Sequence, residues 1–210
     1  MKKLLLLPLA LAFASNAAMA ANSVDISVTG TITPNSCVIS LYGGDFDLGT
    51  IAASALSDSE FTRLPTLWGK RLDILCAGPH QVGFKAIDNR RDENGGTGSF
   101  GLGRDGANNP IGDYVLHMNE TTAFTNGKLK ESWDSGNSWE EVSRLPPINN
   151  RSTVVYAFDT ATSSNTATPL PMTSGNVQLL LSATVRPLSE LDTSAEITID
   201  GSATFELVYL

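Results

Sequence analysis

The residues that could carry catalysis or nucleotide binding form no complete catalytic pattern. The run Gly96-Thr97-Gly98-Ser99-Phe100-Gly101 matches G-x-G-x-x-G, which holds a pyrophosphate only when a strand precedes it and a helix follows it. We expect neither element at this place, so the run is interpreted as a flexible glycine loop. His80 and His117 are the two histidines of the chain, and no G-x-S-x-G or H-E-x-x-H motif surrounds them. We therefore predict that the protein is not an enzyme and uses no cofactor.

Two other groups of residues are candidates for ligand binding. Several carboxylates lie in a region rich in Gly and Asn, where they raise the hypothesis of a Ca²⁺ site: Asp88, Asp92, Glu93, Asp105 and Asp113. The alternating acidic ligands of an EF-hand are absent, so we favour a solvated acidic loop and predict no metal site. Trp133 and Trp139 stand in a polar segment, where they would form either a platform for a sugar ring or anchors packed on the domain.

The chain has two cysteines, Cys37 and Cys76. An even count in an exported chain predicts one disulfide; metal ligation and free thiols are the alternatives, and two cysteines without clustered histidines do not make a metal site. Closing a loop of this length contributes about 4 kcal/mol in the chain-entropy model. We expect the bridge to tie the first strand of the mature chain to a strand near Leu72–Cys76.

The N-terminus predicts export. Lys2 and Lys3 precede an apolar run, and small residues follow up to Ala20, which is typical of a signal peptide spanning residues 1–20. The apolar run is too short to span a membrane. Without Lys2 and Lys3 the net charge falls from −8 to −10. Such an acidic chain does not favour nucleic acid as a partner, because nucleic acid is bound through an excess of Lys and Arg.

The elements that must position these residues are clearest at the two ends of the mature chain. Residues 22–33 alternate, with Val24, Ile26, Val28 and Ile32 on one face and Ser or Thr on most positions of the other. Residues 197–210 alternate in the same way and place Ala203, Phe205, Leu207 and Tyr209 on one face. A period of two is typical of half-buried strands. The N-terminal strand either pairs within its own sheet or swings free and pairs elsewhere.

The middle of the chain predicts further short strands and no helix of ten residues or more. Residues 46–51 resemble a short strand, residues 89–113 a long loop, and residues 119–150 a polar insertion without a clear period. The expected inward faces are Leu72, Ile74 and Cys76; Val82, Phe84 and Ala86; Tyr114, Leu116 and Met118; and Val177, Leu179, Leu181, Ala183 and Val185. Residues 153–158 form another compact, β-branched segment. Short strands separated by turns predict an all-β, antiparallel sandwich.

Four features together resemble the pilin subunits of chaperone–usher fimbriae. They are the pattern Val28-x-Gly30-x-Ile32 before Cys37, the unit Phe46-Asp47-Leu48-Gly49-Thr50-Ile51, the strand that ends at Cys76, and the terminus from Ala203 to Leu210 with Tyr209 as its penultimate residue. Their order and spacing make the resemblance more specific than any one of them. They cover both ends of the mature chain and much of its first third.

The resemblance implies an incomplete immunoglobulin-like sandwich that lacks its final strand and is complemented in trans. Residues 34–210 would be the pilin domain, with a groove beside Ala203, Phe205, Leu207 and Tyr209. A periplasmic chaperone would fill this groove first. At the outer-membrane usher, the arm of the next subunit, residues 21–33 with Val24, Ile26, Val28 and Ile32, would replace it. The implied product is an adhesive fimbria of head-to-tail subunits on the cell surface.

Two departures from the family pattern keep an alternative open. The arm ahead of Val28 is short, so the number of groove pockets it fills is not fixed by the sequence. The excess length lies in residues 89–113 and 119–150. These segments are compatible with a fimbrial adhesin or adaptor subunit that binds a host carbohydrate through its long loops.

Overall fold

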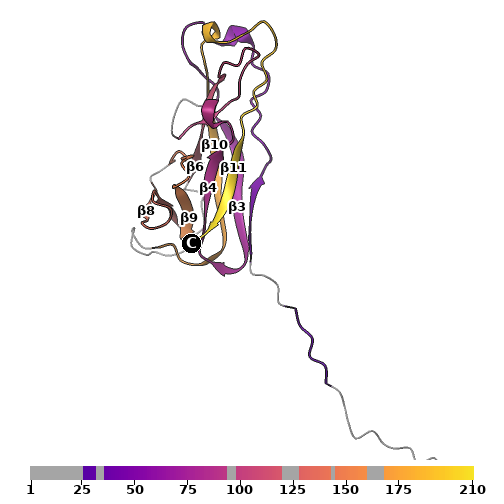
Figure 1. The fold of residues 1–210 in the computed structure, drawn as a ribbon, viewed down its shortest axis with the longest axis vertical. Coiled ribbons are helices and arrows are strands. Elements are labelled where there is room, and N and C mark those ends of the chain that lie inside the picture. The colour runs from indigo at the N-terminus through magenta and orange to yellow at the C-terminus, as the bar shows by residue number, and fades with distance from the viewer. Residues whose placement is uncertain (1–25, 32–35, 94–97, 120–127, 143–144, 160–167) are drawn as a thin grey trace, which may run out of the picture. The chain divides into compact units, whose positions relative to one another are not determined.

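The computed structural model describes residues 26–31, 36–93, 98–119, 128–142, 145–159 and 168–210 (Figure 1). The chain divides into two compact units, residues 1–34 and residues 35–210. Residues 26–31 of the first unit form no regular strand, and Ile26 and Val28 are 85% and 95% exposed. The predicted signal peptide lies outside the described residues, as do Val24 and Ile32 of the predicted arm.

The second unit is an all-β, immunoglobulin-like sandwich of two antiparallel sheets, which confirms the predicted fold class. Its strands are β1 (Cys37–Tyr42), β2 (Thr62–Arg63), β3 (Leu67–His80), β4 (Val82–Asp88), β5 (Phe100–Gly101), β6 (Gly112–Asn119), β7 (Lys128–Ser132), β8 (Glu140–Glu141), β9 (Val155–Asp159), β10 (Met172–Val185) and β11 (Ala203–Tyr209). The helical turns in the described residues are the 3-10 helices η1 (Ala53–Ala55), η2 (Arg91–Glu93) and η4 (Leu188–Glu190). In the part of the chain that the structure describes, no helix is long and apolar enough to cross a membrane.

The sheets place the first and last strands of the sandwich at sheet edges. Sheet A has the order β1-β3-β10-β6-β5, with β2 also paired to β10, and sheet B has the order β11-β4-β9-β7-β8. Figure 1 shows β11, in yellow, running along β4 toward the C-terminal end of the chain. The far edges of the two sheets are formed by β5 and β8, which are two residues long, so the longer edge strands are β1 and β11.

The predicted inward faces form the core between the sheets. The side chains predicted to point inward on β3, β4, β6 and β10 are all at most 7% exposed, and they belong to one apolar cluster. Leu180, which lies on the opposite face of β10, is also buried at 5%. Aliphatic and aromatic residues at every second position predicted these inward faces correctly, because each of these strands packs one face against the other sheet.

The two long segments contain more structure than their composition predicts. Residues 89–113, predicted to be a loop, contain β5 and the start of β6, and Phe100, Leu102 and Ile111 in this segment are buried. Residues 119–150, predicted to be a polar insertion, contain β7 and β8, although 120–127 and 143–144 lie outside the described residues. Apart from β6, these strands are only two to five residues long and lie among frequent Gly, Asn and Asp residues. A strand this short shows too little alternation to be recognised in the sequence.

The predicted strand over residues 197–210 is too long, because β11 begins only at Ala203. The backbone N–H of Asp200 donates to the carbonyl oxygen of Leu102 over 3.1 Å. The chain before β11 therefore bonds to the segment that contains Leu102 instead of continuing along β4. A Cβ atom on Gly201 would lie 2.9 Å from the Tyr114 ring, so only glycine allows the backbone to approach so closely here. Ile197 and Ile199 still pack against the core without forming a strand.

The predicted strand over residues 46–51 is wrong, since this segment has no regular secondary structure. Phe46, Leu48 and Ile51 nevertheless pack against the core and remain partly exposed. The sequence pattern identified apolar residues that face inward, but this backbone pairs with no strand among the described residues.

The disulfide between Cys37 and Cys76 is confirmed. It joins β1 to β3, where Cys37 lies opposite Cys76 in the antiparallel register. We expected the bridge to start from the predicted strand over residues 22–33. It starts instead from a separate strand after Pro34. Sequence analysis missed β1, although Cys37, Ile39 and Leu41 alternate with Val38, Ser40 and Tyr42.

Candidate functional site

The four residues predicted to line a groove lie together on one open strand edge. The backbone N–H of Leu210 donates to the carbonyl oxygen of Gln81, and the N–H of Asn89 donates to that of Ser202, each over 3.0 Å. Alternate residues of an antiparallel strand bond to the same neighbour, so the even-numbered residues from 202 to 210 bond on the β4 side. The odd-numbered residues turn their backbone N–H and C=O groups the other way. We call this row, Ala203, Phe205, Leu207 and Tyr209, the open edge.

The side chains of the open edge point into the sandwich but are not fully covered. Ala203, Phe205 and Leu207 pack against the core cluster and remain half-buried. On the neighbouring strand β4, the opposing residues Phe84 and Ala86 are 0% and 1% exposed. The Phe205 ring packs edge-on against Phe84 with 6.1 Å between ring centroids. The described residues therefore supply a partner on one side of this strand and leave apolar surface uncovered on the other.

A second open strand faces the first one. β1 is the end strand of sheet A, and the N–H of Ala77 donates to the carbonyl oxygen of Ser36 over 3.0 Å. By the same alternation, Cys37, Ile39 and Leu41 turn their backbone polar groups away from β3. β1 and β11 approach each other across the gap between the sheets. We call the gap between these two edges, which belong to opposite sheets, the groove.

Tyr209 crosses this groove at the disulfide end. Its hydroxyl oxygen accepts a hydrogen bond of 2.9 Å from the backbone N–H of Cys37, which links β11 to β1. Its ring packs edge-on against His80, with 5.7 Å between centroids and 84° between the planes. His80 itself, predicted to be a turn residue, is the last residue of β3. No local pattern predicts this contact between the sheets, because it depends on how the two edges are placed.

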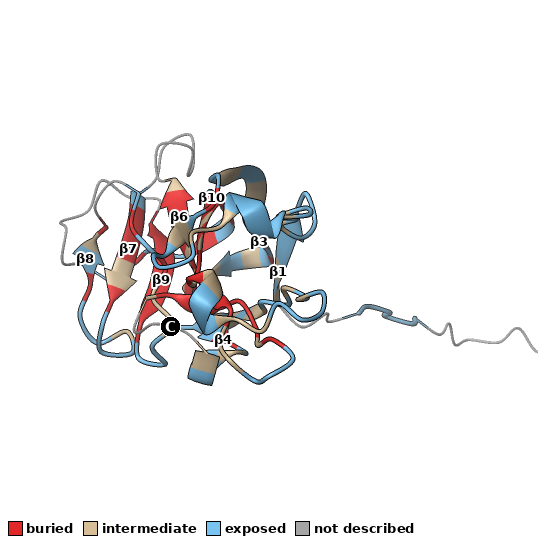
Figure 2. Ribbon diagram, turned by 90° about the horizontal axis from the view of Figure 1, so that it is seen from above, coloured by how far each residue is buried: buried red, intermediate tan, exposed pale blue. Residues whose placement is uncertain are grey.

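The incompletely covered core residues follow the two sides of the groove. Figure 2 shows the buried segments, in red, gathered on strands such as β7, β9 and β6, whereas β1 is pale blue and tan. Among the described residues, the partly buried apolar residues that pack against the main core lie in residues 37–56 or 191–207, apart from Leu67. These residues are Cys37, Ile39, Phe46, Leu48, Ile51, Leu56, Leu191, Ile197, Ile199, Ala203, Phe205 and Leu207. They therefore lie on β1 and β11 or on the segments that border the cavity described next.

Beyond the strands, the chain segments next to β1 and β11 line a cavity of about 680 Å³ whose surface is both polar and apolar. Residues 46–51, which follow β1, line one side, and residues 195–199, which precede β11, line the other. Leu102, Ile111 and Tyr114 contribute core side chains to its lining. The segment predicted to be a strand at 46–51 therefore lines a cavity. The groove is bridged at the Tyr209 end, and this cavity lies beyond its other end.

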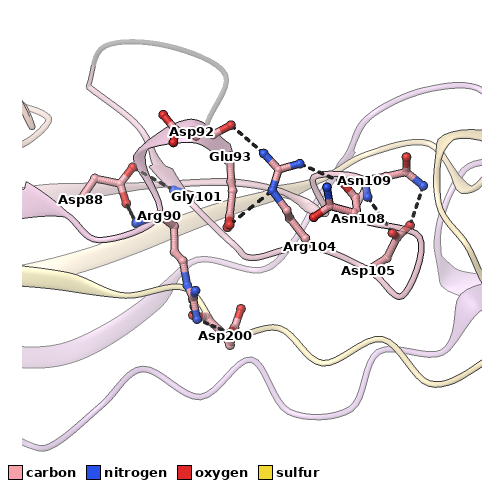
Figure 3. A network of polar contacts seen from close by, with 10 residues as sticks. All are labelled: Asp88, Arg90, Asp92, Glu93, Gly101, Arg104, Asp105, Asn108, Asn109 and Asp200. Carbon is pink, nitrogen blue, oxygen red and sulfur yellow. Dashed lines mark hydrogen bonds and ion pairs between the residues drawn. The ribbon is translucent and has the colours of Figure 1, made fainter.

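A polar network holds the chain that leads into β11 (Figure 3). Arg90 forms an ion pair with Asp200, and the backbone N–H of Arg90 donates to Asp88 over 2.8 Å. Asp105 accepts hydrogen bonds from the backbone N–H groups of Asn109 and Asp192, over 2.8 and 2.6 Å. The bond from Asp192 is the main reason why the pKa of Asp105 lies below its usual value. Asp88 and Asp105, two of the carboxylates considered above for calcium, thus accept hydrogen bonds from backbone N–H groups, and a third, Glu93, forms an ion pair with Arg104.

The two tryptophans of the polar segment have different environments. Trp139 is 3% exposed and packs on the outer face of sheet B against Val155, Ala157 and Val208, so it is an anchor. Trp133 is 45% exposed. Between them, Asp134 accepts hydrogen bonds from the side chain and backbone of Ser138, which are the main reasons why its pKa is lowered to about 2. A platform made of both indole rings is therefore not formed.

The predicted arm and the predicted groove residues belong to different units of the chain. Ile26 and Val28 belong to the first unit, whereas the open edge belongs to the second. Sequence reasoning found the parity of the open edge correctly. It missed the β1 side of the groove, the cavity and the Tyr209 contact. The alternation of β1 was visible in the sequence, but the other two features depend on the tertiary arrangement.

Comparison with known proteins gives two matches. A family model described as "Protein of unknown function (DUF1120)" matches residues 26–107, which include the described part of the arm and β1, β3 and β4. A protein of Escherichia coli (strain K12) described as "Uncharacterized protein YhcF" is 26% identical over 234 aligned residues, covering 95% of each chain. The second match spans both sides of the groove. Neither description names an activity or a partner.

Proposed function

We propose that this protein is a structural subunit of an adhesive surface fimbria, and that subunits join when the N-terminal arm of one chain adds a strand to the open edge of the next. The observation that supports this most strongly is that the open β11 edge and a row of half-covered core residues lie along the same groove. An edge of this kind promotes aggregation unless it is covered. A strand that both bonds to the edge and buries the row would satisfy both requirements.

The arm has the chemistry that this groove needs. Its apolar face carries Val24, Ile26, Val28 and Ile32, and the described members, Ile26 and Val28, are exposed. Burying four such side chains contributes roughly 6–12 kcal/mol before ordering costs are subtracted. The backbone of a strand would add hydrogen bonds to Ala203, Phe205 and Leu207 of β11. Because only alternate side chains enter the groove, the polar face of the arm would stay in water.

Joining one chain's arm to another chain's groove gives a fibre. The two surfaces are different parts of the molecule, so the contact is heterologous and leaves one free arm and one free groove at the ends. Such a contact propagates without closing. Before assembly the groove would need a temporary occupant, which in this proposal is a strand of a periplasmic chaperone. An outer-membrane usher would then exchange that strand for the arm of the next subunit, and the product would lie on the cell surface.

A peptide of residues 21–33 tests the proposal on a chain reduced to residues 35–210, which form their own compact unit. At a peptide concentration of 100 times Kd, binding stabilises the fold by about 2.7 kcal/mol. For a domain of this size, we expect the thermal midpoint to rise by roughly 5–10 °C. A control peptide carries Ser27→Asp and Thr29→Asp on the polar face and should act in the same way. A peptide with Ile26→Asp and Val28→Asp should give no shift, and an equal shift with this peptide would contradict the proposal.

A further inference from the structure

The contact between Tyr209 and Cys37 divides the open edge into two unequal parts. The backbone groups of Ala203, Phe205 and Leu207 face the groove, and among the described strands only β4, on the other side, pairs with β11. At Tyr209 the side chain spans the groove, and the N–H of Cys37 on the opposite edge already donates to its hydroxyl. A strand that entered the groove at this point would have to displace the phenol from between β11 and β1.

We infer that Tyr209 is a positioning residue that closes the disulfide end of the groove and sets where an added strand must stop. This inference rests on the proposed function and states how the added strand is aligned along β11. The added strand bonds to Ala203, Phe205 and Leu207 and continues toward the cavity beside residues 46–51 and 195–199. The bond between Tyr209 and Cys37 stays intact while the strand is bound.

The geometry gives a physical reason for such a stop. A uniform strand edge permits slippage, because a shift by two residues restores both the side-chain parity and the backbone bonds. A groove that is bridged at one end does not permit this shift in that direction. The Tyr209 ring is held from two sides, by the bond of its hydroxyl to Cys37 and by the edge-on contact with His80. The disulfide fixes the strand position of Cys37 relative to β3, so the bridge has a rigid anchor.

The variant Tyr209→Phe removes the hydroxyl and keeps the ring, so the fold should be retained. We expect the backbone amide of Cys37 to exchange its hydrogen about tenfold faster in this variant, measured residue by residue by NMR, because one hydrogen bond is lost. Tyr42→Phe is the matched control, since Tyr42 is exposed on the outer face of β1. Equal exchange of the Cys37 amide in the wild-type chain and in Tyr209→Phe would overturn the inference.

Adding the peptide of residues 21–33 then separates the inference from the proposed function. In the chain of residues 35–210 without further substitutions, the amides of Ala203, Phe205 and Leu207 should become protected, while the Cys37 amide keeps its rate. Protection of the Tyr209 amide, or a faster Cys37 amide, would show that the added strand displaces the bridge and would overturn the inference. If no amide of the open edge is protected in any variant, the proposed function itself is contradicted, whatever the Tyr209→Phe result.

Discussion

Removal of residues 21–33 should abolish chain-to-chain assembly and leave a folded subunit. The described part of the arm forms no strand, and residues 35–210 form a compact unit by themselves, so the deletion takes away no described element of the sandwich. It does take away the strand that would cover a neighbour's groove. When the mature chain is produced with its cognate chaperone and usher, size analysis of surface material should show polymers only for the intact chain.

Substitutions within the arm sharpen this result. Ile26→Asp with Val28→Asp should lower the yield of polymer by about a hundredfold or more, because two apolar side chains that would be buried are replaced by charges. The matched pair Ser27→Asp with Thr29→Asp adds the same charges on the other face and should assemble normally. Polymers of unchanged length from the chain without its arm would show that another surface joins the subunits.

Phe205→Asp should prevent capture of the subunit by its chaperone. Phe205 is in the middle of the open edge, with its side chain in the groove and its ring against Phe84. An aspartate there would be charged on a surface that the chaperone strand must bury, and an unpaired buried charge is strongly unfavourable. We expect recovery of the chaperone complex from the periplasm to fall by about tenfold or more.

A neighbouring position supplies the control for this variant. Thr204 is exposed on the opposite face of β11, so Thr204→Asp adds the same charge without entering the groove. Its complex should be recovered at the wild-type level, since surface substitutions usually change stability by less than about 0.5 kcal/mol. Equal recovery of both variants would mean that the inward face of β11 does not contact the chaperone.

The sequence predicted the sandwich and the parity of its long strands because those features depend on local pattern. Val82, Phe84 and Ala86 alternate with less apolar residues, and burial between two sheets is what such alternation requires. Residues 46–51 show the limit of this reasoning. The sequence predicted a strand there, and the apolar side chains do pack against the core. Whether a backbone finds a pairing strand depends on its neighbours in space, and these are set by the whole fold.

The candidate site was predictable in part for the same reason. The pattern of residues 203–209 identified which side chains face the groove, whereas the exposed edge is a property of sheet order. The β1 side was missed because residues 37–42 form a short strand between a proline break and two glycines, Gly43 and Gly44. The bond from the Cys37 N–H to the Tyr209 hydroxyl joins residues 172 positions apart, and no local pattern encodes such a contact.

The central claim is that the arm of one chain adds a strand to the groove of the next. The most direct measurement of this claim is to map which residues position 28 contacts in assembled fibres. Val28 is replaced by the photo-crosslinking residue p-benzoylphenylalanine, and fibres are grown from a mixture of isotopically light and heavy chains. The strand-addition account predicts crosslinks between different chains, from position 28 of one chain to the groove of the next, at residues 37–51 or 195–209. Crosslinks found only within one chain, or only on outer surfaces such as β8, would contradict it.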